Sequence, residues 1–476
     1  MTKPQTIHSL PQPKGELIFG NLRKFKVPHK HLVFEEWVRE CGSLFRISLM
    51  GKKFIVSADP DINHEILKRR PESFRRFSNI AAVMEEMGIH GVFAAEGESW
   101  KQHRKLVAEA LNARNVQAFY PTLKEISNRL LRKWKRAATT GEIIDVQREM
   151  MRYTVDITTA IAFGYPMNTL EEGNNALQNQ LEHVFPMINS RITAPFPMWR
   201  YFPSKQDKAF ANALKEIKET VQTFIQNAEK RLRENPELKE QPTNFLEALL
   251  VERLQDPTFT DKDIFGNVFT LLLAGEDTTS NSLSWTLFLL TQHPEYIQKI
   301  REEALLIYPD SDVPIDYETM KRLKFTEAVV MESMRLKPVT PSLYMQANET
   351  IVINGLQIEK GMTVMLQNKV AQIQDTNFSE AGQFLPERWL DTSKCPVHNP
   401  DVIRVFGGGP RYCPGKTLAM NELIHTISLI CKHFDLELTV PANEVKEVFA
   451  FTMYPENCLI RLKIENGINH FNYEGL

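Results

Sequence analysis

Apolar residues recur at helical spacing along most of the chain from 98 to 300, and this pattern constrains the fold more than any other feature. Thr260 and Asp263 form a capping box where the longest pattern starts. The spacing predicts amphipathic helices over 100–111, 121–138, 145–163, 206–233 and 243–254, a long helix over 261–291, and another helix over 414–434. A chain of this kind is expected to fold as a mainly α protein.

Strand-like alternation is short and lies outside the helical stretch. It predicts strands over 42–50 and 53–57, joined by a turn at Gly51 and Lys52, and over 350–355, 362–366, 436–440 and 458–464. Residues 1–30 contain Pro4, Pro11, Pro13 and Pro28, which predict an extended lead-in. Because no internal repeat or flexible linker divides the chain, we expect one helix-rich domain over 1–476 with small β-sheets.

Composition limits the classes of partner and compartment. The chain has 57 Lys and Arg against 59 Asp and Glu, which argues against broad electrostatic binding of nucleic acid. Its five cysteines are far apart and never form a C-x-x-C pair, so neither a disulfide framework nor a structural zinc site is expected. The N-terminus lacks the roughly 20 apolar residues of a membrane-spanning helix. We therefore expect a soluble, cytoplasmic monomer without a membrane anchor.

One cysteine lies in a glycine-rich segment, F-G-G-G-P-R-Y-C-P-G, at 406–415. Pro414 fits the first position of the following helix, which makes Cys413 the expected N-cap. A helix N-terminus lowers a cysteine pKa and favours the thiolate, which is either a nucleophile or a metal ligand. His425 is twelve residues away, too far to act as a local base. A lone thiolate suits a metal that a macrocycle already holds, as in haem.

This segment resembles the haem-binding signature of the cytochrome P450 family, F-x-x-G-x-R-x-C-x-G. Its matching positions are Phe406, Gly409, Arg411, Cys413 and Gly415. The resemblance implies haem b with Cys413 as the axial iron ligand, Arg411 on a propionate and Phe406 beside the sulfur. A buried cysteine next to a glycine turn is the alternative reading.

The segment 271–280, L-L-L-A-G-E-D-T-T-S, lies inside the long predicted helix. Glycine and threonines disfavour a regular helix interior, so a local kink with hydroxyls bonded to carbonyls is expected. The segment resembles the distal-helix motif of the same family. By that resemblance Ala274 and Gly275 leave room for dioxygen, and Asp277 and Thr278 form an acid–alcohol pair that delivers protons. Glu276 faces either the proton channel or solvent.

Two further motifs match the family in its order. E-S-M-R at 332–335 and P-E-R-W at 386–389 imply a buried structural triad of Glu332, Arg335 and Arg388. W-K-Q-H-R at 100–104 implies that Trp100 and Arg104 contact a haem propionate. One position departs from the pattern, because Gln346 stands where many members carry an arginine for a propionate.

These resemblances imply a cytochrome P450 fold and a haem-thiolate monooxygenase that inserts one oxygen atom of O2 into an organic substrate. No fused reductase is evident, so electrons from NAD(P)H are expected through a separate ferredoxin or flavodoxin and its reductase. Candidate docking cations are Lys101, Lys105, Arg404 and Lys416. Two alternatives stay open, a peroxide-driven haem enzyme and a ligand-binding protein without catalytic activity.

The expected pocket is apolar, which suggests a hydrophobic substrate such as a fatty acid, terpenoid or steroid-like molecule. Arg191 is either a carboxylate anchor or a surface arginine. The proline-rich stretch 192–203 is either a lid or surface contact, or a packed connector. By the same resemblance, the expected pocket residues are Met84, Val92, Phe93, Met187, Leu273, Val339, Leu343, Phe451 and Thr452.

Overall fold

The computed structural model describes residues 4–25, 29–165, 167–172, 180, 184, 187–188, 190–192, 194, 196–256, 258–391 and 397–464. Helices make up most of the described chain. They are α1 Lys30–Cys41, α2 Pro60–Lys68, α3 Ser78–Glu86, α4 Gly97–Ala110, α5 Ala113–Ala118, α6 Tyr120–Thr140, α7 Val146–Phe163, α8 Thr169–Glu172, α10 Lys205–Glu234, α11 Phe245–Gln255, α12 Asp261–Gln292, α13 Pro294–Ile307, α14 Tyr317–Lys321, α15 Lys324–Leu336, α16 Asn368–Gln372 and α17 Lys416–His433.

The strands are short and form small sheets, as the sequence predicts. They are β1 Leu44–Leu49, β2 Lys52–Ser57, β3 Phe74–Arg76, β4 Ile143–Asp145, β5 Ser342–Ala347, β6 Ile351–Ile353, β7 Leu356–Ile358, β8 Thr363–Gln367, β9 Phe434–Leu438, β10 Lys446–Phe449, β11 Met453–Glu456 and β12 Leu459–Ile464. The largest sheet has the order β1-β2-β8-β5-β3, in which β2 and β8 run parallel.

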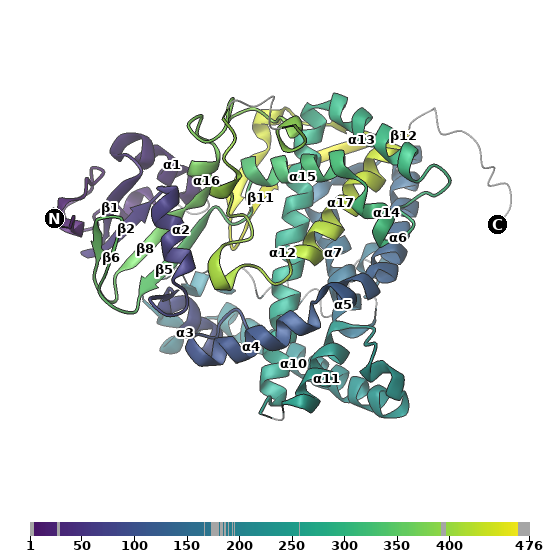
Figure 1. Ribbon diagram of the computed structural model, residues 1–476, viewed down its shortest axis with the longest axis horizontal. Helices are drawn as coiled ribbons and strands as arrows, with labels where there is room; N and C mark the ends of the chain where they lie inside the picture. The colour runs from purple at the N-terminus through teal and green to yellow at the C-terminus, as the bar shows by residue number, and fades with distance from the viewer. Residues whose placement is uncertain are drawn as a thin grey trace.

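The molecule has a sheet region and a helical region, with α12 running through the middle (Figure 1). The predicted capping box starts α12, since the Thr260 hydroxyl and amide both bond the Asp263 carboxylate, at 2.7 and 2.8 Å. The predicted mainly α fold is confirmed, and α4, α6, α7, α10, α11 and α12 lie close to their expected ranges. Among the described residues, no helix is both long enough and apolar enough to cross a bilayer.

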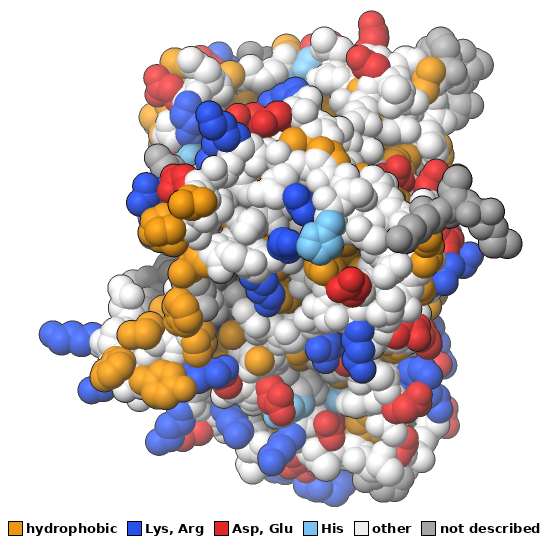
Figure 2. All heavy atoms as spheres, turned by 90° about the vertical axis from the view of Figure 1, so that its left-hand side faces the viewer, with side chains coloured by type: hydrophobic (Ala, Val, Ile, Leu, Met, Phe, Trp, Pro, Cys, Tyr) orange, Lys and Arg blue, Asp and Glu red, His pale blue; other side chains and the backbone are white. Residues whose placement is uncertain are grey.

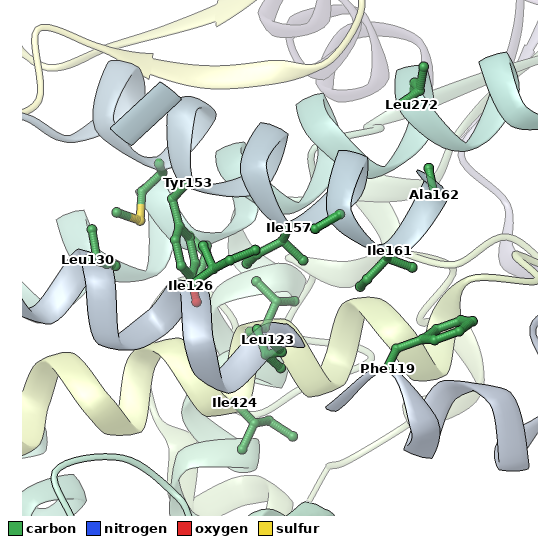
Figure 3. Packing of buried hydrophobic residues seen from close by; sticks show 14 of the residues in the cluster. Phe119, Leu123, Ile126, Leu130, Tyr153, Ile157, Ile161, Ala162, Leu272 and Ile424 are labelled. Carbon is green, nitrogen blue, oxygen red and sulfur yellow. The ribbon is translucent and has the colours of Figure 1, made fainter. Parts of the chain in front are cut away.

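Helices α6, α7 and α17 pack together beside α12 and form the main core. Figure 3 shows the side chains of Leu123, Ile126, Tyr153, Ile157 and Ile424 converging from α6, α7 and α17. All five are buried. The amphipathic spacing of α6 places its apolar residues on this side, and their burial is a main source of stability.

The N-terminal segment contains two short 3-10 helices, Ile7–Ser9 and Leu22–Lys24, so it is not extended throughout, and it packs against the sheet region. Ile7 and Leu10 are buried in a cluster with Ile55, Leu356 and Leu366, from β2, β7 and β8. The lead-in is therefore part of the domain's hydrophobic core.

The proline-rich stretch 192–203 exposes several of its large side chains, whereas Ile192 and Trp199 pack against the main core. Phe196, Met198, Tyr201 and Phe202 are 60%, 57%, 73% and 75% exposed. The packed-connector reading is therefore wrong for these four residues, and the lid or surface-contact reading stays a prediction. Hydrophobic side chains also gather along one edge of the face in Figure 2.

Candidate functional site

A cavity of about 400 Å³ lies between α12, the cysteine segment and the tip of the β10–β11 hairpin. Cys413 and Phe406 line it, together with Ala274, Gly275 and Thr278 of α12. The structure thus brings the expected thiolate and the expected distal motif to one cavity, although 135 residues separate Thr278 from Cys413 (413 − 278).

Cys413 does not cap α17. The helix begins at Lys416 with Gly415 as its N-cap, and the Cys413 amide donates to the Phe406 carbonyl at 2.9 Å. Burial raises the pKa of the Cys413 thiol, while a hydrogen bond from the Gly415 amide and the charge of Arg104 act in the opposite direction. The expected N-cap role is therefore wrong, and the pKa is not lowered in the protein alone, because burial outweighs the hydrogen bond from Gly415 and the charge of Arg104.

Gly409 of the cysteine segment is needed for a close contact within the protein rather than for a ligand. Gly409 has φ +64°, and a Cβ there would collide with the carbonyl oxygen of Leu67 at the end of α2. Gly409 does not line the cavity, whereas Gly407, Gly408 and Gly415 do. Glycine at 409 lets the segment approach α2 closely.

Arg411 and Arg104 both line the cavity, as does Trp100. Arg411 donates to the Ala95 carbonyl at 2.7 Å, forms an ion pair with Glu96 and lies 5.0 Å from the Trp100 ring centroid. Arg104 donates to the Tyr412 carbonyl at 2.7 Å. The three predicted haem contacts therefore share one cavity.

Two more arginines, Arg70 and Arg76, line the same cavity and were missed from the sequence. Among the described residues, Nε of each has no hydrogen-bond partner, and Nη2 of Arg70 lies 4.0 Å from Glu96. Burial lowers the pKa of Arg70 to about 10 and also lowers the pKa of Arg76, and each arginine's neighbouring cations add to the effect. Glu96 is the carboxylate that these arginines and Arg411 share, so positive charge is in excess.

The side chain of Gln346 already has hydrogen-bond partners within the protein. The cation near the strand of Gln346 comes from Arg76 instead. The Gln346 side chain accepts from Arg75 Nε at 3.1 Å and donates to the Gly361 carbonyl at 3.0 Å. Antiparallel pairing of β3 with β5 places Arg76 opposite Met345. The sequence signal was the Arg75–Arg76 pair, but only the strand pairing shows that one of the two reaches the cavity.

The side chains of Asp277 and Thr278 lie in different environments. Thr278 lines the cavity, and its hydroxyl donates to the Ala274 carbonyl at 2.5 Å, as the expected hydroxyl–carbonyl competition requires. The buried Asp277 carboxylate accepts from the Thr452 hydroxyl and from Asn281 Nδ2 at 3.3 Å. Burial raises the pKa of Asp277 to about 6. Asp277 therefore reaches the cavity through Thr452, which lines it.

Neighbouring Glu276 is 1% exposed, so the solvent-facing reading of this residue is wrong.

The three residues of the expected triad meet in the interior and are fully buried. Arg335 donates to both Glu332 oxygens at 2.8 Å, and Arg388 Nε donates to Oε1 at 3.0 Å. Trp389 Nε1 also donates to Glu332 at 3.0 Å, a partner that the sequence did not suggest. Arg335 further donates to the carbonyls of Gln372 and Ala381, so the triad ties α15 to the chain that follows α16.

Six expected pocket residues line the cavity: Val92, Phe93, Val339, Leu343, Phe451 and Thr452. The other three do not, because Met84 and Leu273 are buried in the core and Met187 packs against it. On α12 the cavity is lined by Leu271 together with Ala274, Gly275 and Thr278. Leu273 lies on another face of the helix, since residues three or four apart share a face.

The structure shows the surroundings of Arg191 and of the expected docking cations. Arg191 pairs with Asp207 at 2.8 Å, which occupies the charge that a substrate carboxylate would need. Lys101, Lys105 and Lys416 are exposed, whereas Arg404 lines the cavity. Lys101 bonds Glu98 at 2.7 Å on the same helix.

A cysteine on a glycine segment, a hydroxyl-bearing helix and a group of arginines in one cavity have the chemistry that a haem-thiolate site requires. The chain belongs to the cytochrome P450 family, whose model matches residues 10–460. Members of this family are haem-thiolate monooxygenases that depend on redox partners, so this chain is an oxidoreductase of that class.

The relatives are distant and vary in architecture. Protein LUTEIN DEFICIENT 5, chloroplastic, of Arabidopsis thaliana is 27% identical, over 94% of this chain and 76% of that protein. Putative cytochrome P450 CYP13A7 of Caenorhabditis elegans is 26% identical, over 95% and 93%. Bifunctional cytochrome P450/NADPH--P450 reductase 2 of Bacillus subtilis (strain 168) is 26% identical, over 96% of this chain but 42% of that protein.

Proposed function

We propose that haem b binds in the cavity with Cys413 as the axial iron ligand, and that the enzyme hydroxylates or epoxidises a hydrophobic molecule. The observation that carries this proposal is a lone cysteine in a cavity that also holds an excess of buried arginines. A macrocycle that brings its own iron and two carboxylates satisfies both features at once.

The arginines and Trp100 hold the haem propionates in this proposal. Arg70 is buried and Arg76 is half-buried, and the buried Nε of each has no hydrogen-bond partner among the described residues. Arg411 shares Glu96 with them. Buried guanidinium groups without enough carboxylate are costly, and charge-assisted bonds to propionates remove that cost. Arg104 and Trp100 complete the group from α4.

Haem supplies, when bound, the iron that activates dioxygen. Ala274 and Gly275 are small residues that leave room for dioxygen beside α12. The Thr278 hydroxyl is positioned to hold a proton in the cavity. Asp277 passes protons to the cavity through the Thr452 hydroxyl, and its pKa of about 6 suits proton exchange near neutral pH. Phe451 and Leu343 give the substrate apolar contacts.

Electrons come from NAD(P)H through a separate ferredoxin or flavodoxin and its reductase in this proposal. The exposed cations Lys101, Lys105 and Lys416 support docking of an acidic carrier near the cysteine segment, because they flank it from α4 and α17. The five scattered cysteines support a reducing compartment such as the cytoplasm.

The test is the carbon-monoxide difference spectrum of the dithionite-reduced protein. Wild type should show a strongly red-shifted Soret band that Cys413→Ser abolishes. Cys41→Ser, a change at a half-buried cysteine of α1, should keep the band. A wild-type band in the region typical of histidine ligation, or no haem at all, would overturn the proposal.

A further inference from the structure

Lys30 is a buried lysine in the cavity wall. It is 7% exposed and is the first residue of α1, and its Nζ lies 4.6 Å from the ring centroid of Phe449. Both residues line the cavity. The Lys30 ammonium group therefore meets the cavity beside an aromatic ring.

No carboxylate among the described residues pairs with Lys30. Glu447 lies two residues before Phe449 on β10, but it already bonds His31 and Lys369 at 3.0 Å and also pairs with Lys337. Burial lowers the pKa of Lys30 to about 8, and no acidic neighbour opposes this effect. The charge of Lys30 is therefore uncompensated.

Lys369 provides a direct comparison within the same cluster. It is 5% exposed, close to the value for Lys30, but it contacts Glu35 at 2.8 Å and Glu447 at 3.0 Å. Its pKa is raised, because these carboxylates outweigh burial. Lys369 shows how this region neutralises a structural lysine, and Lys30 lacks that arrangement.

The position of Lys30 at the start of α1 adds a second unfavourable effect. The first amide groups of a helix point outward and carry partial positive charge, which disfavours a cation there and favours an anion. His29 precedes Lys30 and provides no side-chain cap to these amides. A buried cation at a helix N-terminus that faces a cavity is thus arranged for an anionic ligand.

We propose that Lys30 binds the carboxylate of a long-chain amphipathic substrate. The apolar part of that substrate lies along Phe449 and Phe451 of the β10–β11 hairpin and ends beside Thr278, where oxidation occurs. The same hairpin carries Thr452, which links it to Asp277. This inference rests on the proposed monooxygenase function and adds the substrate class and its anchor.

Spectral titration of the haem-loaded enzyme tests the anchor. Saturated acids of ten to sixteen carbons are compared with the primary alcohols of equal length, below their micelle concentrations. The wild type should bind the best acid at least about tenfold more tightly than its alcohol, a difference typical of one charge-assisted contact. Lys30→Met should bring this ratio close to one while leaving alcohol affinity unchanged, and Lys30→Arg should retain a preference.

Lys24→Met is the matched control, because Lys24 is exposed and does not line the cavity. It should keep the wild-type ratio. Equal affinities for acid and alcohol in the wild type, or a preference that survives Lys30→Met, would overturn the proposal. These failures are distinguishable from failure of the proposed function, since the red-shifted carbon-monoxide band would persist in both.

Discussion

The hydroxyl of Thr452 donates a hydrogen bond to the buried carboxylate of Asp277, joining the tip of the β10–β11 hairpin to the middle of α12. Asn281, one turn further along α12, bonds both side chains, at 2.8 Å to Thr452 and 3.3 Å to Asp277. The acid of the distal motif is therefore held by a residue that the motif does not contain.

Thr452→Val should impair oxidation without removing haem. The substitution keeps the shape of the side chain but deletes the hydroxyl between Asp277 and the cavity. We expect product formation to fall by about 10²-fold, the lower range for loss of a positioned proton donor. The measurement is product formed per NAD(P)H consumed, with Thr452→Ser as the control that keeps a hydroxyl. Equal yields from the Val and Ser variants would contradict the relay.

Asp277 should make stability depend on pH. Because burial raises its pKa to about 6, the folded protein keeps this proton at pH values where the unfolded chain has lost it. The free energy of unfolding should therefore decrease as pH rises from about 4 to about 6, by up to roughly 3 kcal/mol. Asp277→Asn should flatten this part of the profile, measured by chemical unfolding of the haem-loaded protein.

The exposed carboxylate of Asp261, at the start of the same helix, supplies the control for that experiment. Asp261→Asn should leave the wild-type slope between pH 4 and pH 6 in place. A slope in Asp277→Asn as steep as that of the wild type would assign the pH dependence to other groups.

Glu332→Ala should destabilise the fold strongly. It leaves Arg335 and Arg388 buried without their shared carboxylate, a loss worth about 3–5 kcal/mol for a buried pair. Glu327→Ala, on the same helix, removes only a surface pair with Lys324 and should cost about 1 kcal/mol or less. Urea unfolding of the two variants measures the difference, and similar midpoints would refute the structural role.

Arg76→Met should accelerate haem loss. If Arg76 bonds a propionate, its removal deletes a charge-assisted contact worth about 1.5–3 kcal/mol, or about 10- to 100-fold in dissociation rate. The rate is measured by transfer of haem to an excess of an acceptor apoprotein. Arg75→Met is the neighbouring control, because Arg75 bonds Gln346 and does not line the cavity. Equal rates for the two variants would exclude Arg76 as a propionate ligand.

Helix prediction succeeded where the apolar pattern was longest, whereas several shorter helices, including α1 and α13, were not predicted. Helices α6, α7, α10 and α12 follow their predicted ranges because each repeats its apolar face over several turns. The short helix α2 was not predicted, since two turns give too little periodicity to distinguish it from a loop. The start of α17 lies two residues later than predicted, because Cys413 bonds back to Phe406 instead of starting the helix.

The predicted pocket residues were also only partly correct. Val339, four residues after the E-x-x-R motif, lines the cavity as expected, and so does Phe451. Leu273 does not, although it adjoins Ala274 in the sequence, because a helix turns neighbouring side chains to different faces. Whether the side chains around Phe202 are buried or exposed likewise depended on which parts of the chain pack against them.

The sequence by itself determined the haem-thiolate class, since its motifs are short segments whose chemistry is local: a cysteine on a glycine turn, an acid and an alcohol within one helix, and a carboxylate three residues before an arginine. Tertiary structure alone decided that Arg76 reaches the cavity through β3–β5 pairing, that Thr452 holds Asp277, and that Lys30 meets Phe449. Thr452 and Asp277 lie 175 positions apart, and Phe449 and Lys30 lie 419 positions apart (452 − 277 and 449 − 30). The paired strands β3 and β5 are also far apart in the sequence. Their contacts follow from packing and strand register, which local periodicity does not encode.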